Sequence, residues 1–550
     1  MTFTPRGSEQ KQIIESEAKL AVVLGGAGTG KTTCALAAAK AHLDRVTRPD
    51  RDRVLFLSFS RASVARISDR SNGILGTHTD HIDVSTFHAL AYSIVRRFGR
   101  LVGRANAVLV SPPRERFGTD PESIGYSQLM PLALKIIRSA PAVADHLRSR
   151  WGLVIVDEFQ DTGDMQHELL NEIAFGARVL LLGDQNQCIY TWRTEDGVRL
   201  ERISEAVEAA GAENTIQLPE VSHRDPSGII PSVARAVLQR DFASPAIVTA
   251  VDDHRLEVRS GIRLEHEVEV VTRVVKDLQD EQYGVAVFTH HNDMLAALSD
   301  GLEADGIQHE IAGLSDALAC ALDTQVAMLQ VTVGTGAWSS VLDALAVFVT
   351  SAQRGRAIPQ LATEILDATG TSNLHSRLSE IRTRLEIASN CEEALHVASH
   401  AHESIGLTSK SAAWEQAAKI IRPMRARAVR QLGAAASERL IARNIASAAR
   451  EATYSALTDI SVNPKDVQLM NLYQTKGREA DATVVVLREG DIMGFEREPF
   501  PSTSRLLYVV FSRARHRITV LLVGHTLHPA VAPLAHLTTI ALVSDGSSDP

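Results

Sequence analysis

The sequence has 550 residues, of which 45% are hydrophobic and 22% charged, with a formal net charge of −9. This length exceeds what one hydrophobic core organises, so we expect several domains, and no apolar run approaches the ~18 residues of a membrane-spanning helix. The N-terminal residues show no apolar stretch after a basic start and the four cysteines form no CxxC pair, so we expect a cytoplasmic protein without a disulfide framework or structural zinc.

The first third of the chain alternates short apolar runs with helical patterns. Its predicted strands are residues 21–24, 53–59, 82–86, 153–158 and 178–184. Each run ends in polar or glycine residues, as in parallel strands that are buried on both faces and carry functional residues at their carboxyl ends. A second set of strands is predicted at residues 284–289, 467–472, 482–487 and 516–524. The sequence therefore predicts an α/β protein with two parallel sheets.

Two stretches interrupt this strand pattern. Residues 313–463 are rich in alanine and have helical periodicity, which predicts an inserted helical domain. A smaller, mainly helical insert is predicted at residues 95–150. The predicted domains are residues 1–94 with 151–222, the insert 95–150, residues 223–312 with 464–535, the insert 313–463, and a polar tail at 536–550.

A glycine-rich run follows the first strand and opens a predicted helix. Such a loop lets backbone N–H groups surround phosphate oxygens at the helix N-terminus, where the helix dipole also favours an anion. Lys31 is expected to reach the β and γ phosphates of a nucleotide, and the Thr32 hydroxyl to bind Mg²⁺. This P-loop consists of Gly25, Gly26, Ala27, Gly28, Thr29, Gly30, Lys31 and Thr32.

Two adjacent carboxylates, Asp157 and Glu158, end the strand predicted at residues 153–158. A metal-bound aspartate beside a glutamate that activates water is a coherent pair for phosphoryl transfer, in which the protein mainly positions groups and stabilises charge. The alternative for Asp157 is a helix N-cap.

Further motifs surround the P-loop in chain order. They are SFSRASV (58–64), TFHAL (86–90), DEFQD (157–161), GDQNQCIYTWR (183–193), SHR (222–224), NLYQTKGRE (471–479) and RLLYVVFSRARHRI (505–518). With these motifs the sequence resembles the UvrD/Rep/PcrA-like superfamily 1 DNA helicases over both α/β parts, about residues 1–312 and 464–525. The resemblance implies two RecA-like P-loop NTPase domains, each carrying a mainly helical insert, with ATP at their interface and single-stranded DNA across their tops.

The resemblance also implies roles for single residues of the first domain. Gln10 is similar to the glutamine that reads adenine. Asp157 would hold Mg²⁺ together with Thr32, and Glu158 would be the general base. Gln187 resembles the sensor of the γ phosphate that links ATP to the DNA groove.

Three residues of the second domain fall at further family positions. Arg224 and Arg513 would be the two arginine fingers, and by analogy such a group contributes ~10³–10⁵ in rate. Glu479 resembles the ribose contact. The chain departs from the family at His223, where a tyrosine commonly stacks on adenine, and at Thr33, where an arginine covers the other face. We therefore expect looser base selectivity or a higher KM for ATP.

The resemblance places aromatic and hydroxyl side chains on the DNA track. Aromatic faces hold any base for ~1–3 kcal/mol without reading sequence, which suits a protein that moves along a strand. The predicted DNA-binding residues are Phe59, Thr86, His88, Tyr190, Trp192 and Thr475. For Phe59 and Phe87, a place in the hydrophobic core is an equal alternative.

The larger insert contains a basic stretch between Lys419 and Arg450, with eight basic residues against one acidic residue, Glu438. It is suited to bind phosphates. A solvated helix face and a contact to an acidic partner are equal alternatives.

The expected function is that of an ATP-dependent single-stranded DNA translocase and 3′–5′ DNA helicase acting in DNA repair, recombination or phage defence. Motif GDQNQCIYTWR resembles the UvrD-like branch and not the oppositely directed RecD-like one. The alternative is a DNA-sensing regulatory ATPase subunit of a nuclease-containing, Gabija-like defence complex with little unwinding of its own. Expected partners are single-stranded DNA, junctions of single- and double-stranded DNA, and a nuclease or repair protein. An RNA-directed motor is a weaker third interpretation, because the motifs follow the DNA branch.

Overall fold

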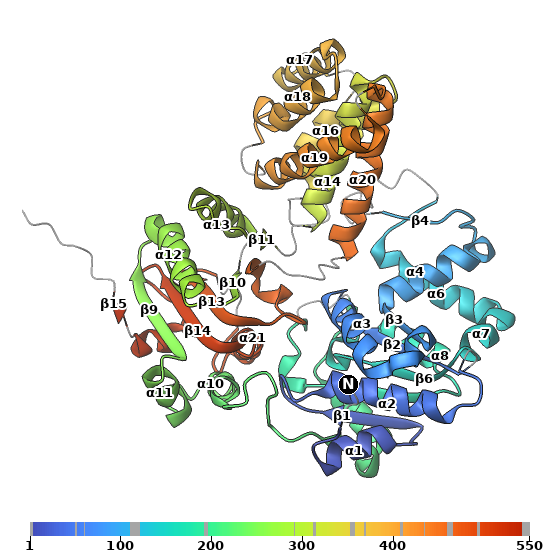
Figure 1. The fold of residues 1–550 in the computed structure, drawn as a ribbon, viewed down its shortest axis with the longest axis vertical. Coiled ribbons are helices and arrows are strands. Elements are labelled where there is room, and N and C mark those ends of the chain that lie inside the picture. Colours follow the sequence, from blue (N-terminus) through green and yellow to red (C-terminus); the bar gives the residue numbers. More distant parts are fainter. Residues whose placement is uncertain are drawn as a thin grey trace, which may run out of the picture. The chain divides into compact units, whose positions relative to one another are not determined.

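The computed structural model describes residues 4–49, 52–59, 61–110, 122–191, 196–290, 292–311, 315–351, 358–367, 370–407, 411–433, 435–458, 466–491, 496–538 and 540–541. The chain falls into two compact units (Figure 1). One unit holds both large sheets and comprises Met1–Gly103, Leu129–Ala312 and Ser461–Pro550; the other comprises Arg104–Gln128 and Gly313–Ile460. The domain boundaries within these units stay predictions.

The first sheet has six parallel strands in the order β3-β2-β6-β7-β1-β8. They are β1 (Leu20–Leu24), β2 (Arg53–Ser58), β3 (Ile82–Thr86), β6 (Trp151–Val156), β7 (Arg178–Gly183) and β8 (Thr215–Gln217). In register, Leu24 pairs with Gly183 and Leu57 with Val156. Strands β1, β6 and β7 therefore end at one edge, where the next residues are the P-loop glycine Gly25, Asp157 and Asp184.

The second sheet has seven parallel strands in the order β11-β12-β10-β13-β14-β9-β15. They are β9 (Leu256–Ile262), β10 (Val285–Thr289), β11 (Glu310–Ile311), β12 (Val467–Asn471), β13 (Ala480–Arg488), β14 (Ala514–Val523) and β15 (Ile540–Ala541). Strand β10 lies between β12 and β13. The chain leaves this sheet after β11 and returns with β12, because helices α14 to α20 stand between these two strands in the sequence. The predicted α/β class with two parallel sheets is confirmed, and all nine predicted strands are present.

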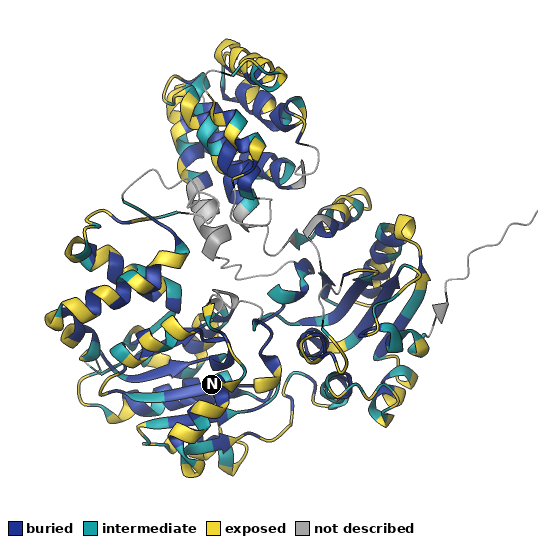
Figure 2. Ribbon diagram, turned by 180° about the vertical axis from the view of Figure 1, so that it is seen from behind, coloured by how far each residue is buried: buried dark blue, intermediate teal, exposed yellow. Residues whose placement is uncertain are grey.

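Helices cover the sheets because the strands carry apolar side chains on both faces. Helices α1, α2 and α3 contribute to one apolar cluster with the first sheet. On the second sheet, α12 and α13 pack in one cluster and α10, α11 and α21 in another. Figure 2 shows the strands of both sheets largely buried. The helices of the sheet-containing part are α1 (Ser8–Glu15), α2 (Lys31–Arg45), α3 (Arg61–Leu75), α4 (Phe87–Phe98), α6 (Tyr126–Ser139), α7 (Pro141–Arg148), α8 (Asp164–Ile173), α9 (Glu201–Ala210), α10 (Ile229–Leu238), α11 (Pro245–Asp252), α12 (Glu267–Asp280), α13 (Asn292–Ala304) and α21 (Pro501–Phe511).

The second unit is mainly helical, as the periodicity of residues 313–463 predicts. Its helices are α14 (Ser315–Thr332), α15 (Trp338–Ser351), α16 (Gln360–Leu366), α17 (Asn373–Ile387), α18 (Cys391–Ser404), α19 (Ser411–Leu432) and α20 (Glu438–Thr458). Helix α14 contacts α15, α17, α18, α19 and α20 and is therefore the central helix. The fully buried Trp414 packs against Phe348 with ring centres 5.0 Å apart, and its Nε1 donates to the Ala398 carbonyl at 2.9 Å.

A short parallel pair, β4 (Val108–Leu109) with β5 (Ser123–Ile124), belongs to this unit as well. It is the described strand pair of the smaller insert predicted at residues 95–150. Residues 542–550 of the predicted tail lie outside the described residues. Among the helices that the structure describes, none is both long enough and apolar enough to cross a membrane.

Candidate functional site

The P-loop joins β1 to α2 and has the backbone form that its glycines predict. Gly28 and Gly30 have φ angles of +80° and +88°, which side chains of L-residues rarely adopt, and a Cβ at Gly28 would collide with the Ser222 hydroxyl. Lys31 is the first residue of α2, and its Nζ donates to the carbonyls of Gly25 at 2.6 Å and Gly26 at 3.1 Å. The ammonium therefore lies across the loop, where phosphate oxygens can take over its hydrogen bonds.

Thr32 and Asp157 bring two oxygen atoms together beside the P-loop. The Thr32 hydroxyl donates to Asp157 Oδ2 at 3.0 Å, and the backbone N–H of Glu158 donates to Asp157 Oδ1 at 3.1 Å. Burial and the neighbouring charge of Glu158 raise the pKa of Asp157. A hydroxyl beside a carboxylate that lacks solvation fits a hard divalent cation such as Mg²⁺, whose charge would reverse that shift.

Glu158 occupies a strained backbone position with φ of +56°, which is uncommon for a residue with a side chain. Burial alone would raise the pKa of its carboxyl, but the positive charges of Lys476, Lys31 and Arg513 outweigh burial and lower that pKa. The carboxylate also accepts from the Gln160 amide. Glu158 is therefore ionised at neutral pH and able to accept a proton. Such strained residues cluster at functional sites.

Arg513 connects the second sheet to the first. It follows α21, is 3% exposed, and donates from Nη2 to Gln187 Oε1 at 3.1 Å. Gln187 in turn donates from Nε2 to Asp184 Oδ2 at 2.8 Å, and the same carboxylate oxygen accepts from the Tyr508 hydroxyl at 3.1 Å. Burial lowers the pKa of Arg513 to about 10, and the charge of Arg224 adds to this. The predicted γ-phosphate sensor and one predicted arginine finger are thus in direct contact.

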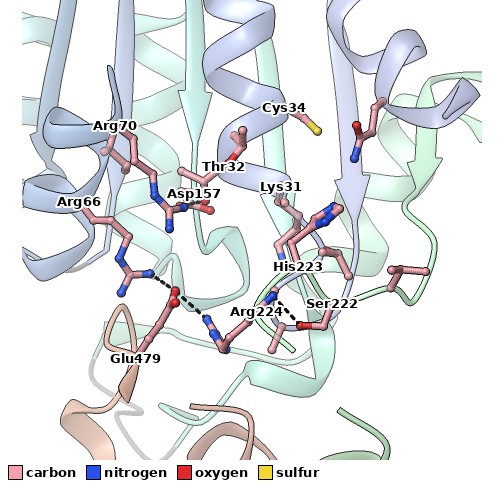
Figure 3. A pocket seen from close by; sticks show the side chains of 18 of the residues that line it. Lys31, Thr32, Cys34, Arg66, Arg70, Asp157, Ser222, His223, Arg224 and Glu479 are labelled. Carbon is pink, nitrogen blue, oxygen red and sulfur yellow. Dashed lines mark hydrogen bonds and ion pairs between the residues drawn. The ribbon is translucent and has the colours of Figure 1, made fainter. Parts of the chain in front are cut away.

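Glu479 forms ion pairs with three arginines, of which Figure 3 shows Arg66 and Arg224. Its Oε1 accepts from Arg224 at 3.0 Å and from Arg66 at 3.1 Å, and its Oε2 accepts from Arg515 at 3.3 Å. Burial would raise the pKa of this carboxyl, but these arginines, Arg224 foremost, hold it far below its usual range. Arg224 also donates to the Ser512 carbonyl.

These groups line one cavity of about 1440 Å³, which exceeds the ~300–1,000 Å³ of most small-molecule pockets. Every predicted nucleotide-site residue except Gly25 and Gly26 contributes to its wall. Its charged lining consists of Arg6, Lys31, Arg66, Arg70, Arg224, Arg513 and Arg515 against Glu9, Asp157, Glu158 and Glu479. This surplus of cations, several of them buried, fits a polyanion such as a nucleoside triphosphate.

Comparison with known proteins identifies a matching domain family and several similar proteins. Residues 10–193 match the family AAA_19, described as an AAA domain. The chain is 22% identical over 389 residues to the ATP-dependent DNA helicase UvrD1 of Mycobacterium leprae (strain TN). The aligned region covers 56% of this chain and 49% of that protein. It is 24% identical over 294 residues to DNA helicase II of Escherichia coli (strain K12), with coverages of 42% and 40%. The chain is a distant homologue of the UvrD-like superfamily 1 helicases.

Further matches agree with this relationship. The ATP-dependent DNA helicase PcrA of Leuconostoc citreum is 24% identical over 297 residues, which are 42% of this chain and 39% of that protein. The matched regions span half or less of the length of these relatives. The AAA_19 match includes the P-loop and the carboxylates Asp157 and Glu158.

Gln10 and His223, which were predicted to contact the adenine base, both line the cavity. Gln10 is 8% exposed, and its Oε1 accepts from the Arg6 backbone N–H at 2.9 Å. The backbone N–H of His223 donates to the Gly28 carbonyl at 2.8 Å, and its ring faces Gly30, where a Cβ would lie 3.2 Å from Cδ2. The roles of these residues and of Thr33 in reading the base stay predictions.

Two of the aromatic residues expected to contact DNA, Phe59 and Tyr190, stack on each other in the structure. Phe59 and Tyr190 have ring centres 4.9 Å apart, and Tyr190 is 6% exposed. The Tyr190 hydroxyl donates to the Tyr473 carbonyl at 2.7 Å, and Lys476 Nζ lies 5.2 Å from the centre of the Tyr190 ring. A base that stacks on Tyr190 must therefore displace one of these neighbours.

The other predicted DNA contacts differ in their surroundings. Thr475 is fully buried and donates to the Leu472 carbonyl at 2.9 Å, and Thr86 caps α4 by accepting from the Ala89 N–H at 3.1 Å. His88 is partly exposed, and Trp192 lies outside the described residues. Phe87 is 3% exposed and belongs to the core. The DNA roles stay predictions.

Three functional candidates were not singled out from the sequence. Arg66 and Arg70 lie one helical turn apart on α3 and line the cavity. In the sequence, two arginines at this spacing after a predicted strand could have indicated that both contribute to the site. Lys476 bonds to the Asp161 carboxylate, and both residues lie within motifs, NLYQTKGRE and DEFQD. Their partnership had no signal in the sequence.

Proposed function

We propose that this protein is an ATP-dependent single-stranded DNA translocase and 3′–5′ DNA helicase that acts in DNA repair, recombination or phage defence. The observation that carries the proposal is the contact of Arg513 with Gln187, because it brings both sheets to the cavity that holds Lys31. A nucleotide in this cavity touches residues of both sheets. Its binding, hydrolysis and release then change how the two sheets fit together, which is the basis of a motor.

The side chains support phosphoryl transfer to water. Lys31 and the P-loop N–H groups hold the phosphates, while Glu158 takes a proton from the attacking water. Arg224 and Arg513 stabilise the negative charge that develops on the transferred group. Thr32 and Asp157 would hold Mg²⁺, which would neutralise part of the negative charge of the phosphates.

A path of contacts links this cavity to the predicted DNA track. Gln187 lies three residues before Tyr190, and Tyr190 bonds to the Tyr473 carbonyl of the second sheet's motif NLYQTKGRE. Lys476 in the same motif lies against the Tyr190 ring. A shift of Gln187 on hydrolysis therefore reaches the aromatic pair of Phe59 and Tyr190. DNA is the proposed substrate because the relatives are named DNA helicases, and the polarity follows motif GDQNQCIYTWR.

The test measures ATP hydrolysis with and without single-stranded DNA, and unwinding of duplexes with a 3′ or a 5′ tail. We expect DNA to stimulate hydrolysis, only the 3′-tailed duplex to open, and Lys31→Ala to abolish both activities. Unwinding from 5′ tails alone contradicts the polarity. Hydrolysis that does not respond to DNA contradicts the motor.

A second candidate is a DNA-sensing regulatory ATPase subunit that serves a nuclease and unwinds little. The burial of Tyr190 and Thr475 favours it, because a closed aromatic pair must open before bases can stack. DNA-stimulated hydrolysis without unwinding of either duplex supports this candidate over the helicase.

A further inference from the structure

One face of α3 forms a wall of the nucleotide cavity. The residues on this face recur at helical spacing and are Ser63, Arg66, Ile67, Arg70, Gly73 and Ile74. Arg66 differs from the others because its guanidinium forms an ion pair with Glu479, which lies 413 residues away in the chain. The side chain of Arg66 is 27% exposed and that of Glu479 is 14% exposed, so the ion pair is only partly screened by water.

Arg66 and Arg224 share a single oxygen atom. Glu479 Oε1 accepts from Arg66 Nη1 at 3.1 Å and from Arg224 Nη2 at 3.0 Å, and Figure 3 shows the two guanidinium groups approaching from opposite sides. The remaining amino group of Arg224 donates to the Ser512 carbonyl. Its buried Nε has no hydrogen-bond partner within the described part of the chain. The guanidinium of Arg224 is therefore bound to the Glu479 carboxylate and the Ser512 carbonyl.

An arginine that stabilises a phosphate must first release such a carboxylate. If Arg224 were the sole cationic partner of Glu479, its departure would leave a poorly solvated carboxylate without compensation, which is strongly unfavourable. Arg66 on the same oxygen and Arg515 on the other keep the carboxylate paired after Arg224 moves. The positive charge of Arg66 also weakens the electrostatic attraction between Glu479 and Arg224.

We propose that Arg66 is a positioning residue for the nucleotide site: by sharing the carboxylate of Glu479, it lets Arg224 exchange from Glu479 to the phosphates of an incoming nucleotide. This inference rests on the proposed hydrolysis of ATP. Arg66 acts through Glu479 and Arg224 and needs no contact with the nucleotide.

The experiment compares steady-state ATP hydrolysis of the full chain as wild type, Arg66→Ala, Arg66→Lys, Glu479→Gln and the double variant Arg66→Ala with Glu479→Gln. In Arg66→Ala, Glu479 holds Arg224 more firmly, so we expect kcat to fall about tenfold, a factor typical of coupling between two groups. KM should change little. Arg66→Lys keeps a positive charge and should recover part of kcat.

The double variant separates this role from a structural one. Removing the charge of Glu479 frees Arg224, so kcat of the double variant should exceed that of Arg66→Ala, although Glu479→Gln raises KM in both backgrounds. A merely structural role of Arg66 predicts no such rescue. Arg96→Ala, a change at an exposed arginine of α4, serves as the matched control and should leave both constants unchanged.

The outcomes distinguish two failures. A wild type that does not hydrolyse ATP overturns the proposed function itself. An active wild type with an equally active Arg66→Ala, or a double variant no faster than Arg66→Ala, overturns the role of Arg66 alone. If Arg66→Ala does not fold, Arg66→Gln keeps the aliphatic stem and takes its place in the same comparison.

Discussion

Lys476 and Asp161 form an ion pair in which both side chains are buried, 3% and 0% exposed. Asp161 follows β6 of the first sheet, and Lys476 follows β12 of the second. After burial, Lys476 is the strongest influence on the carboxyl of Glu158, and it lowers that pKa. The same ammonium lies 5.2 Å from the centre of the Tyr190 ring. The charge of Lys476 therefore acts on Glu158, the candidate general base, and lies close to Tyr190 of the predicted DNA track.

Removal of this ammonium should destabilise the fold and impair the site. We expect Lys476→Met to lower the free energy of unfolding by about 3–5 kcal/mol, because it withdraws the cation from a buried carboxylate. Urea denaturation followed by circular dichroism measures the change. Adding Asp161→Asn should restore most of the stability, since no buried charge is then left uncompensated. A loss below about 1 kcal/mol, typical of exposed pairs, contradicts this role.

The oxygen pair of Thr32 and Asp157 predicts dependence on a divalent cation. Asp157→Asn should lower ATP hydrolysis about 100-fold and raise the Mg²⁺ concentration needed for half-maximal activity, because it removes the anionic ligand. Chelation with EDTA should abolish activity in the wild type. The matched pair Thr32→Ser and Thr32→Val tests the hydroxyl, and we expect the serine variant alone to keep its Mg²⁺ response. An unaltered Mg²⁺ titration in Asp157→Asn assigns the cation to other ligands.

Asp83 in β3 predicts loss of stability in acid. Its carboxylate accepts from Arg53 at 2.7 Å and from Trp151 Nε1 at 2.8 Å. Burial would raise the pKa of Asp83, but these hydrogen bonds and the charge of Arg150 hold it below its ordinary value. Because the folded pKa lies below the unfolded value of ~3.9, the stabilisation is present above that pH and is lost as the pH falls through the folded pKa.

Asp83→Asn should therefore lower the free energy of unfolding by about 2 kcal/mol at pH 7, as expected when charged hydrogen bonds are replaced. The difference from wild type should shrink as the pH falls below about 4. Urea denaturation at a series of pH values checks both statements. Asp80→Asn, at an exposed position nearby, is the control and should change stability by less than about 0.5 kcal/mol. A difference that is constant with pH excludes an electrostatic origin.

The basic stretch on α19 predicts contact with nucleic-acid phosphates. Arg422, Arg427 and Arg430 are exposed, whereas Arg425 pairs with Glu392 at 2.9 Å. The double variant Arg427→Glu with Arg430→Glu should weaken DNA binding and reduce the slope of log affinity against log salt by about 1 for each lost phosphate contact. Fluorescence anisotropy at several salt concentrations measures both. Arg384→Glu on α17 is the control in the same helical unit. Equal affinities in both variants favour a solvated face or an acidic protein partner.

Most strands with continuous apolar runs were predictable from the sequence, whereas the mixed strand β9 was not. β7 has the sequence RVLLLG and is buried on both faces, so its composition alone indicates a central strand. β9 has the sequence LEVRSGI, and its polar Glu257 and Arg259 bond to each other, with Arg517 of β14 as a further partner of Glu257. The contact between Glu257 and Arg517 exists only once β14 lies beside β9. The short strands β8, β11 and β15 offered too few residues for a pattern.

The sequence by itself determined the P-loop and its neighbours Lys31 and Thr32, because the positive φ angles of Gly28 and Gly30 and the start of α2 depend on adjacent residues. It also placed Asp157 and Glu158 at the end of an apolar strand. Only the tertiary structure decided that Arg66 shares Glu479 with Arg224, or that Lys476 reaches Asp161 across 315 residues of chain. A charged side chain pairs with whatever opposite charge the packed sheets bring within reach in a poorly solvated interior, and that choice depends on packing between distant segments, which local patterns do not encode.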